Sequence, residues 1–260
     1  TNNLMWYLKE NSNVHLITIA STGEYSHYAN VDIEEGYFTF ESRGRTSTEC
    51  IFPRRPTSIY HTSKVASTYL VDYCSRIWNL HTTDIMQAVV FGAYTDDIVM
   101  SGIQTRFDTD ECFGTVINRF IVQALLKEPL TIYGQGNHKR GFISLNDSIQ
   151  ALTIAIENKP AAGKTRVWNQ LSEWHSINDI AQMVANVAKK FNIEVTTQNL
   201  ESLRHEDTND HYYNYICEIL PSLGYKPTRT IEQEIEYCIN LLKDQDLSDL
   251  KSVIIPKIKF

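Results

Sequence analysis

Three absences narrow the classes of protein to which this chain of 260 residues can belong. It contains no apolar run of about 18 residues, so no membrane-spanning helix is expected. Its lysines and arginines do not cluster and its formal net charge is −7, which argues against a nucleic-acid-binding surface. Scattered cations of this kind suit a small anionic ligand better than a polyanion.

Cysteine is scarce and forms no recognisable pattern. The five cysteines lie far apart, none belongs to a C-x-x-C pair, and their number is odd. This distribution argues against a disulfide framework or a zinc site and favours a reducing intracellular compartment. We expect the cytoplasm, or the plastid stroma in a photosynthetic eukaryote. The cysteines are Cys50, Cys74, Cys112, Cys217 and Cys238.

The hydrophobic pattern switches between short apolar runs and helical periods. Residues 14–21 and 82–92 are apolar and rich in β-branched side chains, which predicts buried parallel strands, and residues 57–80 between them have helical spacing. Strands that alternate with helices predict an α/β fold, a Rossmann-like doubly wound parallel sheet followed by a smaller C-terminal α/β lobe. We place the first domain at 1–165, with 106–140 contributing to the lobe at 166–260.

The rest of the chain supplies further elements of both kinds. A short helix at 4–8 comes first, and a hairpin is expected around 36–48. Asn146 and Asp147 are good cap residues for one later helix, and Ser176 for another. Strands are predicted at 130–134, 140–145 and 165–170, and helices at 113–127, 146–158, 176–191, 212–225 and 230–243.

The helical segment 57–80 carries a tyrosine and a lysine one turn apart. In "SIYHTSK" (58–64), Tyr60 and Lys64 share a helix face, where the ammonium can favour the phenolate. A phenolate placed there can take the proton of a sugar hydroxyl while hydride leaves the same carbon. Ser21 ends the preceding strand, at the sheet edge where ligands bind in open α/β folds. Tyr-x-x-x-Lys alone is common by chance, so the flanking strands are what favour catalysis.

The order strand-Ser, Tyr-x-x-x-Lys helix, strand-Gly resembles extended short-chain dehydrogenase/reductase proteins. Narrower matches resemble one family of the NAD-dependent epimerase/dehydratase group, the UDP-sulfoquinovose synthases. The matches run nearly from end to end: "GEY" (23–25), "DIEEGY" (32–37), "YHTSK" (60–64), "TDIMQAVVFG" (83–92), "RFDTDECFGTVINRF" (106–120), "PLTIYGQG" (129–136), "RGFISLNDSIQALT" (140–153), "RVWNQ" (166–170) and "HYYN" (211–214).

The resemblance implies an enzyme that converts UDP-glucose and sulfite to UDP-sulfoquinovose with a retained NAD, as a homodimer when full length. The implied steps are oxidation at C4, elimination across C5 and C6, sulfite addition, and re-reduction at C4. Tyr60 would be the acid/base at C4, Lys64 would bind the nicotinamide ribose, and Ser21 would hold the reacting oxygen. Gln87 and Val90 would line the nicotinamide.

The resemblance also points to groups for the elimination. Glu24 and His61 would move protons at C5 and C6. From the residues alone, the favoured interpretation of Glu24 is a turn carboxylate that caps N–H groups, and that of His61 is a helix-face histidine. Thr22 stands where relatives carry methionine, which changes the packing near the nicotinamide. His211 and Tyr212 in "HYYN" would organise the substrate site, without an assigned chemical role.

Binding of UDP calls for cations on the diphosphate and for contacts with the uracil. Arg140 and Arg204 match phosphate-binding arginines, since a guanidinium can pair with two phosphate oxygens at once. Arg106 and Asn118 match positions that contact the sugar or the diphosphate. Tyr133 lies near the expected uracil pocket.

The dinucleotide-binding fingerprint G-x-x-G-x-x-G is absent. "GQGNHKRG" (134–141) does not replace it, because it opens no helix on which a pyrophosphate could sit. In relatives the fingerprint precedes the point where this chain starts. We therefore expect the C-terminal two-thirds of an enzyme, with an apolar, unpaired sheet edge and no NAD binding when expressed alone.

Two other functions stay open. A UDP-sugar 4-epimerase or 4,6-dehydratase would share Tyr60, Lys64 and the arginines. The dehydratase is disfavoured because Thr22 and Gly23 follow Ser21 where an Asp-Glu pair is usual. A non-catalytic nucleotide-sugar-binding relative would explain the missing glycines, but not the intact Ser21, Tyr60 and Lys64.

Overall fold

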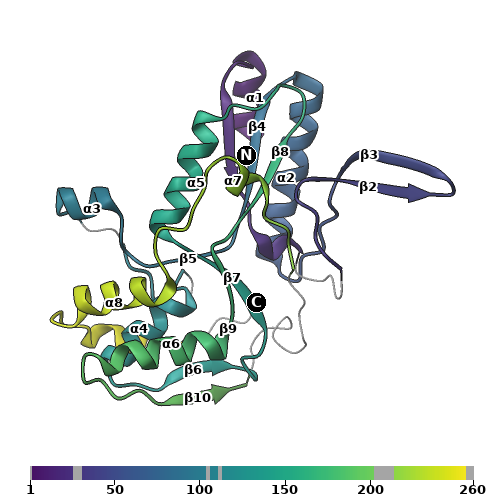
Figure 1. Ribbon diagram of the computed structural model, residues 1–260. Coiled ribbons are helices and arrows are strands. Elements are labelled where there is room, and N and C mark those ends of the chain that lie inside the picture. Colours follow the sequence, from purple (N-terminus) through teal and green to yellow (C-terminus); the bar gives the residue numbers. More distant parts are fainter. Residues whose placement is uncertain (1, 26–30, 104–105, 111–112, 202–213, 256–260) are drawn as a thin grey trace. The chain divides into compact units, whose positions relative to one another are not determined.

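The computed structural model describes residues 2–25, 31–103, 106–110, 113–201 and 214–255 (Figure 1). The chain forms two compact units, which we describe separately. Unit 1 comprises Thr1–Ala88, Gln150–Leu171 and Tyr212–Lys226, and unit 2 comprises Val89–Ile149, Ser172–His211 and Pro227–Phe260. These units interleave along the chain. The sequence-based division, with a boundary after residue 165 and with 106–140 contributing to the lobe, stays a prediction. Among the described helices, none combines the length and the apolar character needed to cross a bilayer.

A three-stranded parallel sheet in the order β1-β4-β8 forms the centre of unit 1. Its strands are β1 (His15–Ile19), β4 (His81–Gln87) and β8 (Arg166–Gln170). The parallel sheet between helices confirms the α/β prediction. The prediction that β1 is buried is wrong: its residues are half-buried and Ile19 is 44% exposed, because β1 has one described neighbour.

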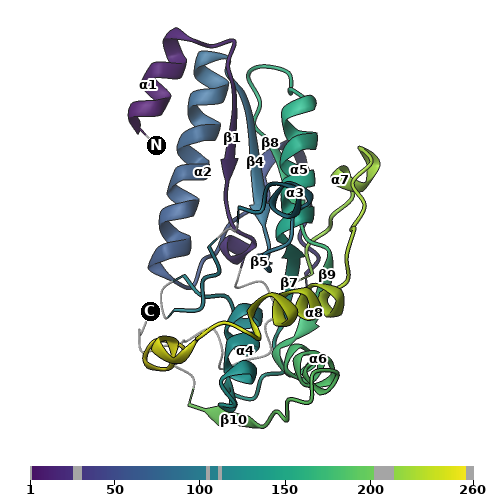
Figure 2. The ribbon, with the colours of Figure 1, turned by 90° about the vertical axis from the view of Figure 1, so that its left-hand side faces the viewer.

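The long helix α2 (Ile59–Trp78) of unit 1 begins and ends with local signals. The Oγ of Ser58 accepts the N–H of His61 at 3.2 Å, and Asn79 ends the helix in the left-handed conformation. Val71 of α2 packs with Leu8 of α1 (Asn2–Glu10), which lies beside α2 in Figure 2. The predicted helices 57–80 and 4–8 are therefore confirmed. The predicted hairpin forms from β2 (Tyr37–Ser42) and β3 (Arg45–Ile51).

Two small sheets belong to unit 2. The first has the order β5-β7-β9, with β5 (Val89–Phe91), β7 (Lys139–Ser144) and β9 (Glu173–Ser176). The second pairs β6 (Leu130–Tyr133) with β10 (Thr197–Leu200). The predicted single strand 82–92 is wrong, because it divides into β4 and β5, which belong to different sheets. The backbone N–H of Ala88 bonds to Gln170 of β8, and the next residue pairs with β7 instead.

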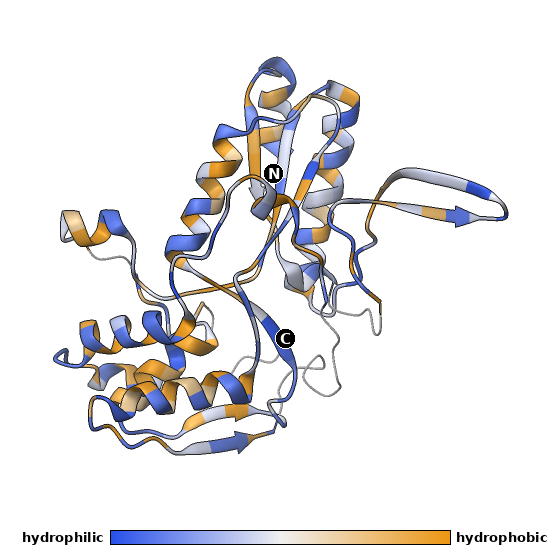
Figure 3. Cartoon of the chain, viewed as in Figure 1, coloured by the Kyte–Doolittle hydropathy of each residue, from blue (hydrophilic) through white to orange (hydrophobic). Residues whose placement is uncertain are grey.

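The core of unit 2 lies among helices. It includes Phe120, Val184 and Ile235, and hydrophobic residues of these helices are orange in Figure 3. Capping boxes at Ser176 and Thr230 start two of them, as the cap signal at Ser176 predicted. The described helices of unit 2 are α3 (Asp96–Ser101), α4 (Val116–Leu125), α6 (Ile177–Lys189) and α8 (Ile231–Leu242), with a 3-10 helix at Ser248–Ser252.

Two local predictions are corrected. Helix α5 (Leu145–Glu157), which crosses the boundary between the units, is capped by the Ser144 hydroxyl, which accepts the N–H of Asp147 at 3.1 Å, rather than by Asn146 and Asp147. The predicted helix 212–225 shrinks in its described part to α7 (Ile219–Ser222). The backbone N–H groups just ahead of this turn are bound to Glu35, far away in the sequence.

Candidate functional site

The polar residues of unit 1 meet where β1 ends and α2 begins. A 3-10 turn, Thr22–Tyr25, follows Ser21, whose Oγ accepts the N–H of Gly23 at 3.2 Å. Gly23 lies directly against the imidazole of His61: a Cβ at Gly23 would sit 2.2 Å from His61 Nε2. The other ring nitrogen of His61, Nδ1, is 2.9 Å from the Oγ of Ser58. The turn and the first turn of the helix therefore hold His61 between them.

Glu24 lies in this turn and is completely buried. Its Oε1 accepts the N–H of Ser21 at 3.2 Å, so the capping role expected of a turn carboxylate is present. Burial is the main cause that raises the pKa of Glu24 to about 7, with a further rise from Asp84 and an opposing effect from Arg54. A carboxyl with such a pKa can both take and give a proton near neutral pH.

Tyr60 and Lys64 flank the same end of β1. The Nζ of Lys64 donates to the carbonyl of Ile19 at 2.8 Å and lies 5.6 Å from the centroid of the Tyr60 ring. The Tyr60 ring meets His61 edge to face, with centroids 5.0 Å apart. Because Tyr60 is 52% exposed, its phenol can be reached by a ligand. The structure thus brings Tyr60, His61 and Lys64 together next to the end of β1.

The other predicted cofactor residues lie on separate elements. Thr22 is buried, and its hydroxyl donates to the carbonyl of Gln87 at 3.4 Å, which joins the turn to the end of β4. Val90 lies on β5 of unit 2, opposite Ile143. The structure therefore connects Gln87 with the turn at Ser21, while the place of Val90 at the nicotinamide stays a prediction.

Three residues around Glu24 were not predicted from the sequence. Arg54 has a fully buried side chain that lies 3.9 Å from Glu24 and stacks on the Tyr25 ring at 4.4 Å. Asp84 of β4 and Thr68 of α2 are also buried. Two sequence features could have pointed to these residues. They are the charged residue inside the strand "TTDIMQ" and the arginine in "PRRP" just ahead of the helix.

The predicted substrate residues of unit 2 occupy different surroundings. Asn118 is buried on α4 and its Oδ1 accepts the N–H of Gly92 at 3.0 Å, so it supports the backbone after β5. Tyr133 ends β6, with the guanidinium of Arg119 5.6 Å from its ring centroid. Arg140 lies on β7 and is half-buried.

The remaining predicted residues give less information. Arg106 is 69% exposed at its side chain and forms ion pairs with Asp108 and Asp110. Arg204, His211 and Tyr212 lie outside the described residues. The roles of these residues in substrate binding stay predictions.

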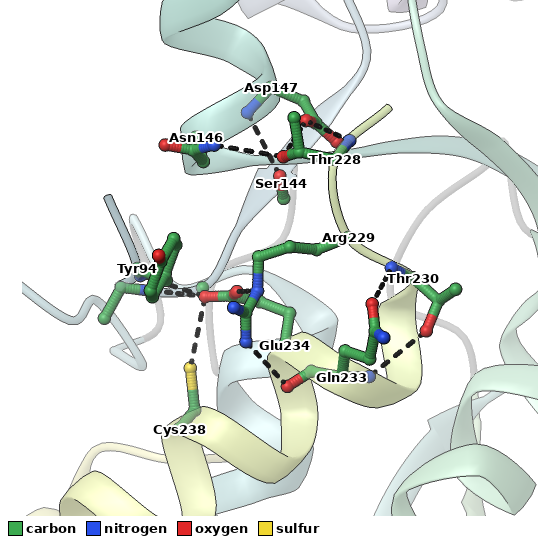
Figure 4. A network of polar contacts seen from close by, with 12 residues as sticks. Tyr94, Ser144, Asn146, Asp147, Thr228, Arg229, Thr230, Gln233, Glu234 and Cys238 are labelled. Atoms are coloured by element: carbon green, nitrogen blue, oxygen red, sulfur yellow. Dashed lines mark hydrogen bonds and ion pairs between the residues drawn. The ribbon is translucent and has the colours of Figure 1, made fainter. Parts of the chain in front are cut away.

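Unit 2 contains its own buried glutamate, Glu234, at the centre of a polar network (Figure 4). It accepts the N–H groups of Ala93 at 3.0 Å and Tyr94 at 2.9 Å. The Nε of Arg229 lies 3.0 Å from its other oxygen. One carboxylate oxygen thus accepts two backbone N–H groups and the other forms an ion pair with Arg229, which is typical of a group that holds a structure together.

Comparisons with known proteins agree with this geometry. A protein-family model described as the NAD dependent epimerase/dehydratase family matches residues 1–170. A UDP-sulfoquinovose synthase of Sulfolobus acidocaldarius is 38% identical over 255 residues, which cover 97% of this chain and 64% of that protein. A chloroplastic UDP-sulfoquinovose synthase of Spinacia oleracea is 35% identical over 257 residues, covering 98% of this chain and 53% of that protein.

The chain therefore spans between about half and two thirds of the length of these curated relatives. Among solved structures, a UDP-N-acetylglucosamine 4-epimerase from Methanobrevibacter ruminantium superposes with a TM-score of 0.69 at 18% identity, over 92% of this chain and 66% of that one. At this identity the likeness concerns the fold, and it confirms the Rossmann-type architecture.

Proposed function

Because this chain belongs to the NAD-dependent epimerase/dehydratase family, we propose that it carries the catalytic helix of a UDP-sulfoquinovose synthase. The natural protein would convert UDP-glucose and sulfite to UDP-sulfoquinovose and water. Identity of 38% and 35% to two proteins of that name, over nearly the whole chain, supports this choice. We also propose that the natural protein is a cytoplasmic or stromal homodimer.

The observation that carries the proposal is the buried Glu24 in the short turn whose Gly23 lies against His61. After oxidation at C4, the proton on C5 becomes acidic and the C6 hydroxyl can leave as water. Glu24 can take the C5 proton because its pKa is raised to about 7, and His61 can protonate the leaving hydroxyl. A 4-epimerase removes no proton from C5 and has no use for this pair. The sulfite then adds to C6 of the conjugated enone.

The residues at the end of β1 fit an NAD-dependent site. An ammonium has three N–H groups, and one of those on Lys64 donates to Ile19, which leaves donors for ribose hydroxyls. When bound, NAD supplies the acceptor for the C4 hydride and returns that hydride at the end. Tyr60 would take the proton of the C4 hydroxyl and give it back, and Ser21 would donate a hydrogen bond to the same oxygen.

Incubation of the natural protein carrying this chain with UDP-glucose, with and without sulfite, tests the proposal. We expect UDP-sulfoquinovose by mass spectrometry only when sulfite is present. A sulfite-independent 4-keto product would identify a dehydratase, and UDP-galactose an epimerase. Binding of UDP-glucose without turnover would identify the non-catalytic alternative.

Matched variants assign the chemistry to residues. Tyr60→Phe and Glu24→Gln should each lose at least about 100-fold in kcat, the usual contribution of a general acid or base. Asp72→Asn is the control, because Asp72 is a buried carboxylate of the same helix that is bound by Tyr37 and Arg76. Equal losses in all three variants would contradict the assignment.

We propose that Arg140 and Arg204 bind the diphosphate. Arg106 and Asn118 would contact the sugar or the diphosphate, and Tyr133 would lie near the uracil. For Arg140→Ala we expect a raised KM for UDP-glucose with a smaller change in kcat, because the diphosphate is bound equally in ground and transition states. Lys139→Ala, an exposed neighbour on β7, is the control and should leave KM unchanged.

A further inference from the structure

A second carboxylate lies beside Glu24 in the interior of unit 1. Asp84 of β4 is 1% exposed and Glu24 is 0% exposed. Thr68 of α2 lies between them: its Oγ1 is 2.7 Å from Asp84 Oδ2 and 3.5 Å from Glu24 Oε2. A hydroxyl has a single proton to donate. Thr68 therefore serves one carboxylate at a time, and the shorter contact is with Asp84.

Asp84 is the better satisfied member of this pair. Its Oδ1 receives a second short hydrogen bond, from the hydroxyl of Thr18 at 2.6 Å. Glu24 has longer contacts, 3.2 Å to the N–H of Ser21 and 3.9 Å to Arg54. When two carboxylates share a buried site, one of them tends to hold a proton. The contacts favour Glu24 as the one that exchanges it.

One buried cation faces this pair. Arg54 lies in the segment ahead of α2, and its guanidinium is held over the Tyr25 ring, so its charge is fixed next to Glu24. Lys64 of α2 is the other cation whose charge acts on Glu24, and His61 lies against the adjoining Gly23. Two carboxylates, one arginine with a fully buried side chain and one shared hydroxyl therefore lie close together.

We propose that Asp84 and Arg54 are positioning residues that set how readily Glu24 releases and takes up its proton, with Thr68 linking the two carboxylates. Asp84 and the side chain of Arg54 are buried, and each acts through Glu24. The inference rests on the proposed function, because the proton concerned is the one that Glu24 would exchange at C5. The inference assigns a part in this proton exchange to Asp84, Arg54 and Thr68, which would otherwise be interpreted as interior residues without a functional role.

The charges of Asp84 and Arg54 shift the pKa of Glu24 in opposite directions. Burial and the charge of Asp84 raise the pKa of Glu24, while Arg54, the Ser21 N–H and Lys64 lower it. Loss of the Asp84 charge should therefore make Glu24 a stronger acid, and loss of the Arg54 charge a weaker one. A purely structural role for these residues would change stability without moving the proton equilibrium in opposite directions.

The test compares Asp84→Asn with Arg54→Gln in the natural protein that carries this chain. The first readout is the pH profile of kcat/KM for UDP-glucose with sulfite, whose acidic limb reports the base. The second is the titration of the Glu24 carboxyl by 13C NMR, assigned by the signal lost in Glu24→Gln. We expect both midpoints to fall by about one pH unit in Asp84→Asn and to rise by about as much in Arg54→Gln.

Controls keep the result interpretable. Asp72→Asn removes a buried carboxylate from α2 that does not contact Glu24 and should leave both midpoints in place. If Asp84→Asn does not fold, Thr68→Val replaces it: without the hydroxyl the charge of Asp84 is less compensated, so the midpoint should rise, and Thr68→Ser should restore it.

The two readouts separate this inference from the proposed function. If the NMR midpoints move in opposite directions but no UDP-sulfoquinovose forms, the positioning role stands and the function is wrong. If the product forms while the Glu24 titration is the same in Asp84→Asn, Arg54→Gln and the parent protein, the positioning role is wrong. A shift of equal size in Asp72→Asn would also overturn it.

Discussion

Each unit contains a completely buried glutamate, and the two are held in very different ways. Glu234 of unit 2 is bound by Ala93, Tyr94 and Arg229, all within 3.0 Å. Glu24 of unit 1 has contacts of 3.2 to 3.9 Å, and its pKa is raised to about 7. Two equally buried glutamates thus differ in role: Glu234 is held in place by its contacts, whereas Glu24 can exchange a proton. The length of the polar contacts, rather than burial, distinguishes a candidate catalytic carboxyl.

The largest effect should come from removal of the glutamate that is held tightly. Glu234→Ala leaves two backbone N–H groups without their acceptor and Arg229 without its ion-pair partner, and should lower the free energy of unfolding by about 3 kcal/mol. Urea denaturation measures this. Glu236→Ala is the control on the same helix: its exposed ion pair with Lys190 should contribute less than about 1 kcal/mol. Similar losses for both would show that the network adds nothing.

The loosely held glutamate should instead make stability depend on pH. Its folded-state pKa of about 7 lies above the ordinary 4.5, so its stabilising contribution is complete below pH 4.5 and is lost as pH rises through 7. The change over this window is about 3 kcal/mol. Glu24→Gln should remove this part of the pH dependence, as measured by urea denaturation from pH 4 to pH 8. Glu236→Gln should retain it.

The elements that were predicted well from the sequence are those whose caps and apolar spacing lie within one short stretch of the chain. The helix α2 has its cap at Ser58 and its apolar spacing within one stretch, and Tyr60 and Lys64 follow from that spacing. The strand 82–92 was predicted as one strand because its apolar run is continuous. Its division at Ala88 depends on a hydrogen bond to Gln170, far along the chain, which no local pattern encodes.

The candidate site likewise contains residues that no local sequence pattern predicts. Glu24, His61 and Ser21 lie in short motifs and were predicted, whereas Arg54 and Asp84 come from segments about 30 and 60 residues further on. The predicted helix at 212–225 failed for a related reason. The backbone N–H groups of Glu218 and Ile219 bind the carboxylate of Glu35, so the described helix begins only at Ile219.

Gly92 lies against Glu234 and Gly23 lies against His61, so alanine at each position tests how tightly these side chains are held. A Cβ at Gly92 would lie 2.3 Å from Glu234, at a φ of +89°, and two backbone N–H groups and the ion pair with Arg229 hold Glu234 in place. Gly92→Ala should cost about 2 kcal/mol of unfolding free energy. The three atoms nearest to a Cβ at Gly23 all belong to the side chain of His61, which can shift more easily than a carboxylate held by backbone N–H groups.

Gly23→Ala should therefore cost less stability, under about 1 kcal/mol, but displace His61 and lower turnover. Denaturation midpoints and turnover rates, measured on both variants, separate the two effects. A larger stability loss in Gly23→Ala than in Gly92→Ala would contradict the view that Glu234 is held more tightly than His61.

The smallest effects should come from two helix caps, one on the helix of Glu234 and one on α2. Thr230 caps the helix of Glu234, and Ser58 caps α2 and also contacts His61 Nδ1 at 2.9 Å. Replacement of either by alanine should cost about 1 kcal/mol of unfolding free energy. Only Ser58→Ala should also lower turnover of UDP-glucose with sulfite, because only that cap orients a group of the candidate site. Equal turnover in both variants would mean that the His61 orientation does not limit the reaction, and would leave Glu24 as the group on which the elimination depends.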